Sequence, residues 1–265
     1  MTKKVTVKTL LEMKQKGEKI ASLTAYDASF ARILDNAGID IILVGDSLGM
    51  VLQGNETTLN VSVADMIYHI NMVKQGCSRA LLIGDMPFMS YSTPAQALGT
   101  ASRFVAEGGA EVVKLEGGAM FVDTIKNLIR HGIPVCGHLG LTPQSIHKLG
   151  GYNVQGRDTD TADRILEDAK MLEDAGISML VLECVPQKLA KKITEFLSVP
   201  VIGIGAGGQC DGQVLVLHDM LGLTDQPPRF SRNFLESASS ISKAVQSYVR
   251  DVKEGTFPAE NHQFD

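Results

Sequence analysis

Short runs of apolar residues recur along the chain, each preceded by a glycine-containing turn and followed by a polar or charged residue. Apolar runs of this length, bounded by turns, are typical of strands buried on both faces, as in a parallel sheet. The stretches between them carry apolar residues three and four positions apart, which predicts amphipathic helices. The predicted strands cover residues 20–24, 41–45, 80–84, 112–115, 134–137, 179–182, 201–204 and 214–217.

Helix-start signals support this alternation. Thr93, Pro94 and Gln96 form a predicted capping box with proline at the first helical position. A segment over residues 6–16 predicts a helix that closes the barrel bottom. The amphipathic stretch 234–252 predicts a terminal helix.

Eight strand and helix signals in about 250 residues are what a (β/α)8 TIM barrel requires. No linker or low-complexity tract divides the chain, so we expect a single domain over residues 1–265, with extra N-terminal and C-terminal helices. The link at 205–213 leaves little room for a helix, so an open doubly wound sheet remains the alternative. The G-x-G-x-x-G spacing at 203–208 precedes a strand, which favours a tight turn over a dinucleotide site.

Composition narrows the function classes. Hydrophobic residues make up 44% and charged residues 21%, which indicates a globular chain with a sizeable core. The 25 basic and 30 acidic residues give a net charge of -5, which disfavours a nucleic-acid partner. No apolar run approaches the ~20 residues of a membrane helix, and the N-terminus does not resemble a signal peptide. We therefore expect a cytoplasmic protein without a membrane partner. The wide spacing of the four cysteines does not support a zinc site or a disulfide framework, and Cys136 and Cys184 are expected to be small buried apolar residues.

Polar side chains follow five successive predicted strands. These residues are Asp46, Asp85, Glu116, His138 and Glu183. The carboxyl ends of parallel barrel strands converge on one mouth, so the pattern predicts a shared site there. The alternative is five separate surface residues, each satisfied locally, for example as a helix cap.

Three of the five are carboxylates on neighbouring strands, and like charges this close are costly unless a cation lies among them. Oxygen ligands favour a hard ion, Mg²⁺ first and Mn²⁺ second. We predict Asp46 and Asp85 as direct ligands and Glu116 as a ligand either directly or through water. A hydrogen-bonding role suits His138 better than metal ligation.

Lys114 shares a strand face with Glu116, because side chains two positions apart point the same way. An ion pair with a neighbouring carboxylate is the favoured interpretation. The alternatives are that Lys114 contacts an anionic substrate or that it forms a Schiff base as a nucleophile. The long segments 47–61 and 139–157 follow two of these strands and predict substrate lids. The alternative is a disordered or oligomer-contacting loop.

The chain resembles the ketopantoate hydroxymethyltransferase family at residues 24–27, 44–50, 114–118, 137–145, 181–186 and 202–207, in family order. The resemblance implies a Mg²⁺-dependent TIM-barrel enzyme. Its expected reaction transfers a hydroxymethyl group from 5,10-methylenetetrahydrofolate to 3-methyl-2-oxobutanoate, giving 2-dehydropantoate for pantothenate and coenzyme A biosynthesis. It also implies a cytoplasmic homodecamer.

The resemblance implies roles for individual residues. Asp46, Asp85 and Glu116 would bind the metal, and Glu183 would accept the proton. The implied keto-acid contacts are Asp46, Ser47, Asp85, Lys114 and His138. Three alternatives stay open: a Mg²⁺-dependent enolate lyase of the isocitrate lyase or phosphoenolpyruvate mutase type, a Schiff-base aldolase, and an inactive barrel that serves binding or assembly.

Overall fold

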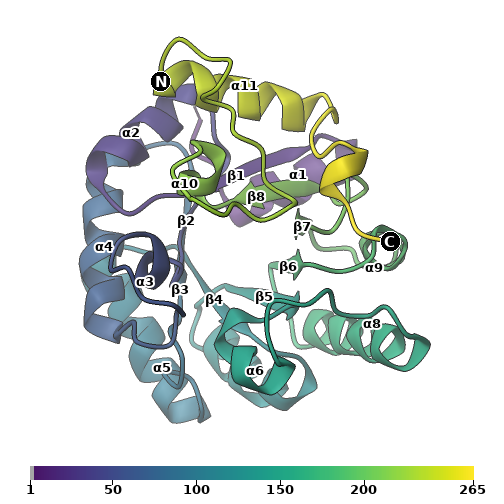
Figure 1. Ribbon diagram of the computed structural model, residues 1–265. Coiled ribbons are helices and arrows are strands. Elements are labelled where there is room, and N and C mark those ends of the chain that lie inside the picture. The colour runs from purple at the N-terminus through teal and green to yellow at the C-terminus, as the bar shows by residue number, and fades with distance from the viewer. Residues whose placement is uncertain (1–2) are drawn as a thin grey trace.

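The computed structural model describes residues 3–265, which fold around a closed barrel of eight parallel strands (Figure 1). Each strand pairs with the next in the chain, and the last pairs with the first. The strands are β1 (Ile20–Thr24), β2 (Ile41–Val44), β3 (Leu81–Asp85), β4 (Val112–Glu116), β5 (Val135–Gly140), β6 (Met179–Glu183), β7 (Val201–Ile204) and β8 (Gly212–Leu215). The predicted barrel is confirmed, and the open-sheet alternative is wrong.

Helices surround the barrel in the view along its axis (Figure 1). They are α1 (Val7–Lys16), α2 (Ala28–Ala37), α3 (Leu48–Val51), α4 (Val63–Gly76), α5 (Pro94–Arg103), α6 (Val122–Arg130), α7 (Ile146–Leu149), α8 (Thr159–Asp174), α9 (Gln187–Phe196), α10 (Leu217–Met220) and α11 (Ile241–Lys253). Thr93 caps α5, as predicted, by accepting from the Gln96 backbone N–H. The Gln96 side chain accepts from Ser92 instead of completing the box with Thr93.

The N-terminal segment crosses the lower end of the barrel, as predicted. The Val5 N–H donates to the Arg79 carbonyl, just before β3. At the other end of the segment, Lys14 Nζ lies 2.7 Å from Asp211 Oδ2, just before β8. Since both partners precede strands, α1 lies under the bottom and leaves the opposite mouth open.

The last strand and the last helix differ from the prediction. β8 begins at Gly212 rather than residue 214, because pairing with Ile20 and Ile202 starts directly after the turn. The terminal helix begins only at Ile241. The apolar residues before it are buried without being helical; Phe234, for example, packs edge-on against the Tyr248 ring.

The predicted tight turn after β7 is confirmed. Gly205 has φ +61° and Gly207 has φ +86°, which L side chains rarely adopt. A Cβ at Gly205 would lie 2.8 Å from the Phe230 ring. No helix separates β7 from β8. The neighbouring seam between β8 and β1 is covered on its outside by α11. Tyr248 Oη donates to the Ser22 and Gln213 carbonyls at 2.8 and 3.1 Å, which joins α11 to β1 and β8.

The remaining sequence expectations concern the core and the membrane. Within residues 3–265, no helix is long and apolar enough to cross a bilayer. All four cysteines are buried and unbonded to one another, and the predicted burial of Cys136 and Cys184 is confirmed.

Candidate active site

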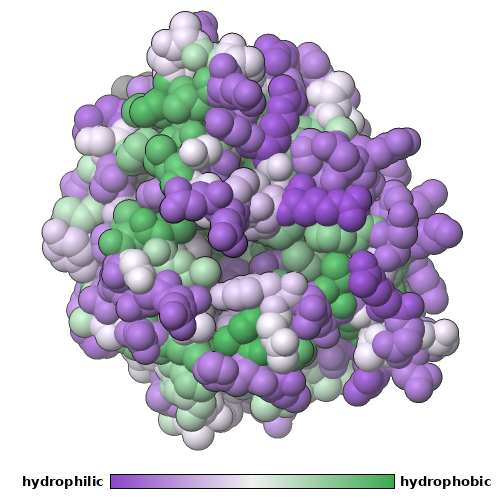
Figure 2. All heavy atoms as spheres, in the orientation of Figure 1, coloured by the Kyte–Doolittle hydropathy of each residue, from purple (hydrophilic) through white to green (hydrophobic). Residues whose placement is uncertain are grey.

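A cavity of about 880 Å³ opens at the carboxyl ends of the strands. In the space-filling view the centre of this face is hollowed, and its rim is mostly hydrophilic (Figure 2). All seven residues predicted for the site line it: Asp46, Ser47, Asp85, Lys114, Glu116, His138 and Glu183. The structure therefore brings together side chains from five successive strands or the loops that follow them.

Strand register explains this convergence. Asp85 on β3 pairs with Lys114 on β4. Glu116 on β4 pairs with His138 on β5. Partners in register point to the same side of a parallel sheet, and here that side is the barrel interior. All four side chains are buried.

Lys114 is ion-paired, as the favoured interpretation predicted. Its Nζ lies 2.6 Å from Asp85 Oδ2 and 3.8 Å from Glu116 Oε1. Burial favours the neutral amine, but the charges of Asp85, Glu116 and Asp46 outweigh it and raise the pKa of Lys114. A Schiff-base nucleophile needs a free amine, so this environment disfavours that chemistry.

Three buried carboxylates face this single ammonium. Burial and then the charge of Glu116 raise the pKa of Asp46 to about 6. Burial raises the pKa of Glu116 to about 7 and that of Asp85 well above its ordinary value. Within residues 3–265, neither Asp85 Oδ1 nor Glu116 Oε1 has a hydrogen-bond partner. The cluster therefore has unused acceptor atoms and more negative than positive groups.

This donor set suits a hard cation only with help from other ligands. Within residues 3–265, no three acidic, histidine or cysteine side chains converge closely enough to hold a metal ion by themselves. Mg²⁺ usually takes one or two carboxylates and completes its shell with water and substrate oxygens. Asp46 and Asp85 fit that pattern. Glu116, whose Oε1 lies 3.8 Å from Lys114 Nζ, could contact such an ion directly or through water.

Gln144 organises the cluster, and the sequence analysis missed it. Its Nε2 donates to Asp46 Oδ2 and to the Met86 carbonyl, both at 2.9 Å. Its backbone N–H donates to Glu116 Oε2 at 3.0 Å, and its Oε1 accepts from Tyr91 at 2.5 Å. The signal available in the sequence was a polar residue next to Pro143 in the predicted lid, which by itself does not reveal burial.

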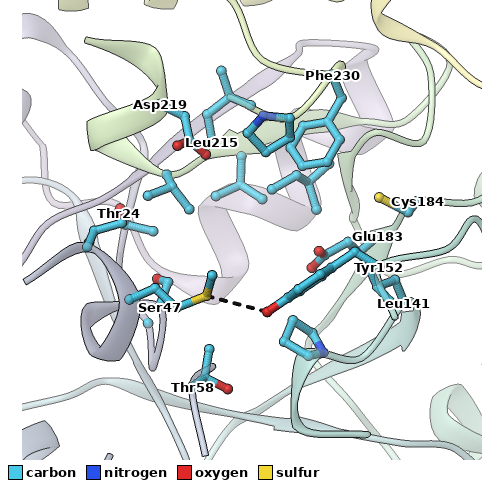
Figure 3. Close-up of a pocket in the computed structure, with 18 of the residues that line it drawn as sticks. Thr24, Ser47, Thr58, Leu141, Tyr152, Glu183, Cys184, Leu215, Asp219 and Phe230 are labelled. Carbon is cyan, nitrogen blue, oxygen red and sulfur yellow. Dashed lines mark hydrogen bonds between the residues drawn. The ribbon is translucent and has the colours of Figure 1, made fainter. Parts of the chain in front are cut away.

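His138 lies between two carboxylates. Its Nδ1 is 3.2 Å from Glu116 Oε1, and its Nε2 is 3.3 Å from Glu183 Oε2. Burial and the nearby Lys114 charge lower the pKa of His138, so the imidazole is neutral at pH 7. Glu183 is less enclosed, with 15% of its side chain exposed, and it points into the cavity (Figure 3). His138 thus links the buried cluster to the one predicted site carboxylate that faces open space.

The two predicted lids flank the cavity. The first contributes Met50 and Thr58, and the second contributes Leu141 and Tyr152. Tyr152 Oη approaches Met50 Sδ at 3.6 Å across the opening (Figure 3). Both loops contain short helices, α3 and α7. They therefore occupy the position expected of substrate lids.

The opposite wall was not foreseen. It comprises the segment after β8, including His218, Asp219, Thr224 and Phe230. In Figure 3, Asp219 and Phe230 lie across the cavity from Ser47 and Thr58. The helix α10 that carries His218 and Asp219 has four residues, too few to show a hydrophobic period.

Solved structures share this architecture at low identity. A phosphoenolpyruvate phosphomutase from Streptomyces platensis subsp. rosaceus has a TM-score of 0.61 at 13% identity, over 82% of each chain. A phosphonopyruvate hydrolase complex with oxalate and Mg²⁺ has a TM-score of 0.62 at 10% identity, over 97% of this chain and 92% of that one. At these identities the likeness concerns the fold alone.

Sequence relatives are much closer. The sequence model of the ketopantoate hydroxymethyltransferase family matches residues 4–260. The 3-methyl-2-oxobutanoate hydroxymethyltransferases of Shewanella frigidimarina and Erwinia tasmaniensis are each 56% identical over 263 residues, 99% of both chains. The resemblance noted in the sequence is confirmed: this chain is an enzyme that belongs to the ketopantoate hydroxymethyltransferase family.

Proposed function

We propose that the enzyme transfers a hydroxymethyl group from 5,10-methylenetetrahydrofolate to 3-methyl-2-oxobutanoate, giving 2-dehydropantoate and tetrahydrofolate. The observation that carries the proposal is a buried cluster of three carboxylates and one ammonium, with Glu183 at its edge facing a large cavity. The names of the 56%-identical relatives supply the keto acid.

The floor of the cavity suits the polar end of a 2-oxo acid. Lys114 and the Ser47 hydroxyl, which lies 2.8 Å from Tyr26 Oη, offer donors to its oxygens. Asp46 and Asp85 would hold Mg²⁺ directly, and Glu116 would do so directly or through water. The bound ion supplies Lewis acidity that stabilises negative charge developing on the keto oxygen.

Glu183 acts as the base. The C3–H bond of the keto acid breaks, and its proton goes to the Glu183 carboxylate. The electron pair left on C3 forms a bond to the methylene carbon, and both bonds from that carbon to the folate nitrogens break. Water supplies the hydroxyl oxygen, and the two nitrogens take up one proton from Glu183 and one from that water. His138 Nε2 lies 3.3 Å from Glu183 Oε2, and His138 would contact the substrate beside that carboxylate.

Solvent exchange tests the proposal directly. We expect the enzyme to replace the C3 hydrogen of 3-methyl-2-oxobutanoate with deuterium when Mg²⁺ is present and folate is absent, as followed by proton NMR. Formation of 2-dehydropantoate should require both Mg²⁺ and the folate. Absence of Mg²⁺-dependent exchange would refute the mechanism. Carbon–carbon cleavage without folate would instead indicate a lyase of the isocitrate lyase or phosphoenolpyruvate mutase type.

We also propose that the enzyme is a cytoplasmic homodecamer, as its family resemblance implies. Several large apolar side chains are exposed, among them Met120 at 79% and Tyr68 at 62%, and contacts between subunits would cover them. Analytical ultracentrifugation should show one species with ten times the mass of the chain. A monomer at micromolar concentration would contradict the assembly.

A further inference from the structure

The cavity extends well beyond the floor that suits the keto acid. Its volume of about 880 Å³ is in the range of pockets that enclose drug-sized ligands, whereas a five-carbon keto acid is much smaller. The remaining space reaches the wall after β8, where Leu215, Phe230 and Phe264 present apolar surface. This part of the cavity therefore fits a larger and flatter molecule.

One carboxylate stands in this wall with little to balance it. Asp219 is 6% exposed, and within residues 3–265 its side chain accepts from one donor, Thr224 Oγ1 at 2.5 Å. Burial raises the pKa of Asp219, and the Thr224 hydrogen bond offsets this only in part. A carboxylate has about four acceptor positions, so most of those on Asp219 remain unused. A buried acceptor in this state favours a ligand with N–H donors.

The neighbouring residue is a second, independent sign of a ligand. His218 lines the same cavity, and within residues 3–265 its buried Nδ1 has no hydrogen-bond partner. Its ring lies 5.7 Å from the Tyr26 ring, and burial lowers its pKa, so the imidazole is neutral. Two adjacent polar residues in this wall, among those the structure describes, thus have hydrogen-bonding positions that the protein does not fill.

We propose that Asp219 binds the pterin ring of the folate co-substrate and accepts hydrogen bonds from its ring N–H and its 2-amino group. These two donors lie side by side on one edge of the ring and match the two oxygens of a carboxylate, as a guanidinium does. The flat ring packs against Phe230, and His218 contacts it beside Asp219. The inference rests on the proposed function, because it assigns a place to that folate.

The position of Asp219 also orients the ligand usefully. Asp219 and Glu183 lie on different sides of the cavity, with open space between them (Figure 3). The nitrogen that carries the transferred carbon lies on the opposite ring from the pterin's donor edge. A pterin held at Asp219 therefore directs that carbon toward the space in front of Glu183.

Calorimetry with two ligands tests the proposal on the intact enzyme. The probes are tetrahydrofolate and its analogue with a methyl group in place of the 2-amino group. We expect the wild type to bind the analogue about 10- to 100-fold more weakly than tetrahydrofolate, because the Asp219 carboxylate loses the hydrogen bond from the 2-amino group. In Asp219→Asn, tetrahydrofolate should bind weakly, and the difference between the two ligands should fall below about threefold. Asp225→Asn, an exposed carboxylate in the same segment, is the matched control and should behave as wild type.

Equal affinity of the wild type for the two ligands would overturn the assignment, and this comparison does not depend on whether a variant folds. Wild-type affinity in Asp219→Asn, or an equal loss in Asp225→Asn, would also overturn it. Failure of the proposed function gives a different result, because C3 exchange into the keto acid needs no folate. Missing exchange in the wild type counts against Glu183 and the metal, whereas missing ligand discrimination counts against Asp219.

Discussion

Replacing Gln144 with methionine removes the side chain that joins the carboxylate cluster to its surroundings. Methionine has a similar volume, so the packing around the site is largely kept. The change deletes the donor to Asp46 Oδ2 and to the Met86 carbonyl, and the acceptor for Tyr91 Oη. The backbone N–H that reaches Glu116 remains. The perturbation therefore acts mainly on how Asp46 is held.

The size of the effect follows from these contacts. A hydrogen bond to a charged group contributes about 1.5–3 kcal/mol, and each buried group left without a partner costs about 1–3 kcal/mol. The losses of the three hydrogen bonds are not additive, because water can enter beside Asp46. We therefore expect Gln144→Met to lower the free energy of unfolding by about 2–4 kcal/mol. Loss of a group that orients a metal ligand typically reduces metal affinity about 10- to 100-fold.

Two measurements check these values. Urea denaturation gives the change in unfolding free energy, and titration of C3 exchange with Mg²⁺ gives the apparent metal affinity. Gln246→Met, on the outer face of α11, is the matched control and should change neither quantity. Mg²⁺ affinity within twofold of wild type in a folded Gln144→Met enzyme would refute the role assigned to Gln144.

Three further predictions concern the base, the metal and stability. Glu183→Gln should bind the keto acid but lose C3 exchange by about 10²–10⁴-fold, and normal exchange would remove Glu183 from the base role. Asp46→Ala and Asp85→Ala should each lose Mg²⁺ binding and activity together; calorimetry that shows unchanged metal uptake would contradict this. Asp35 is buried, which raises its pKa, but donors in residues 78–80 outweigh burial and lower it. The ionised Asp35 carboxylate therefore stabilises the fold above about pH 4, and this stabilisation is lost as the pH falls further. Asp35→Asn should lower the free energy of unfolding by about 2–3 kcal/mol at pH 7. The difference from wild type in urea denaturation should be smaller at pH 3.

Local patterns were enough to predict the barrel and the polar ring at its mouth. Each strand is an apolar run, and Asp85 and Glu116 end two of them in sequence as they do in space. The β8 boundary was wrong because Val216 and Leu217 extend the apolar run, although Leu217 is already helical and donates to Thr24 Oγ1. An apolar run does not show where pairing stops.

Contacts between distant segments were beyond sequence reasoning. Gln144 meets Asp46 across 98 residues, and its importance comes from burial that only the closed barrel creates. Asp219 lies in a four-residue helix, too short to show a hydrophobic period, so no local pattern marks it. In the structure, Gln144 is recognised by its hydrogen bonds to Asp46 and Tyr91, and Asp219 by its unused acceptor positions.

The position of α11 near the end of the chain has a consequence for synthesis on the ribosome. The seam between the first and last strands gains its outer cover from α11, through the Tyr248 hydroxyl. Chains emerge N-terminus first, so this seam closes only after Tyr248 has left the exit tunnel. Until then the nascent chain presents an unsealed strand edge, which is the stage at which chaperone binding would protect it most.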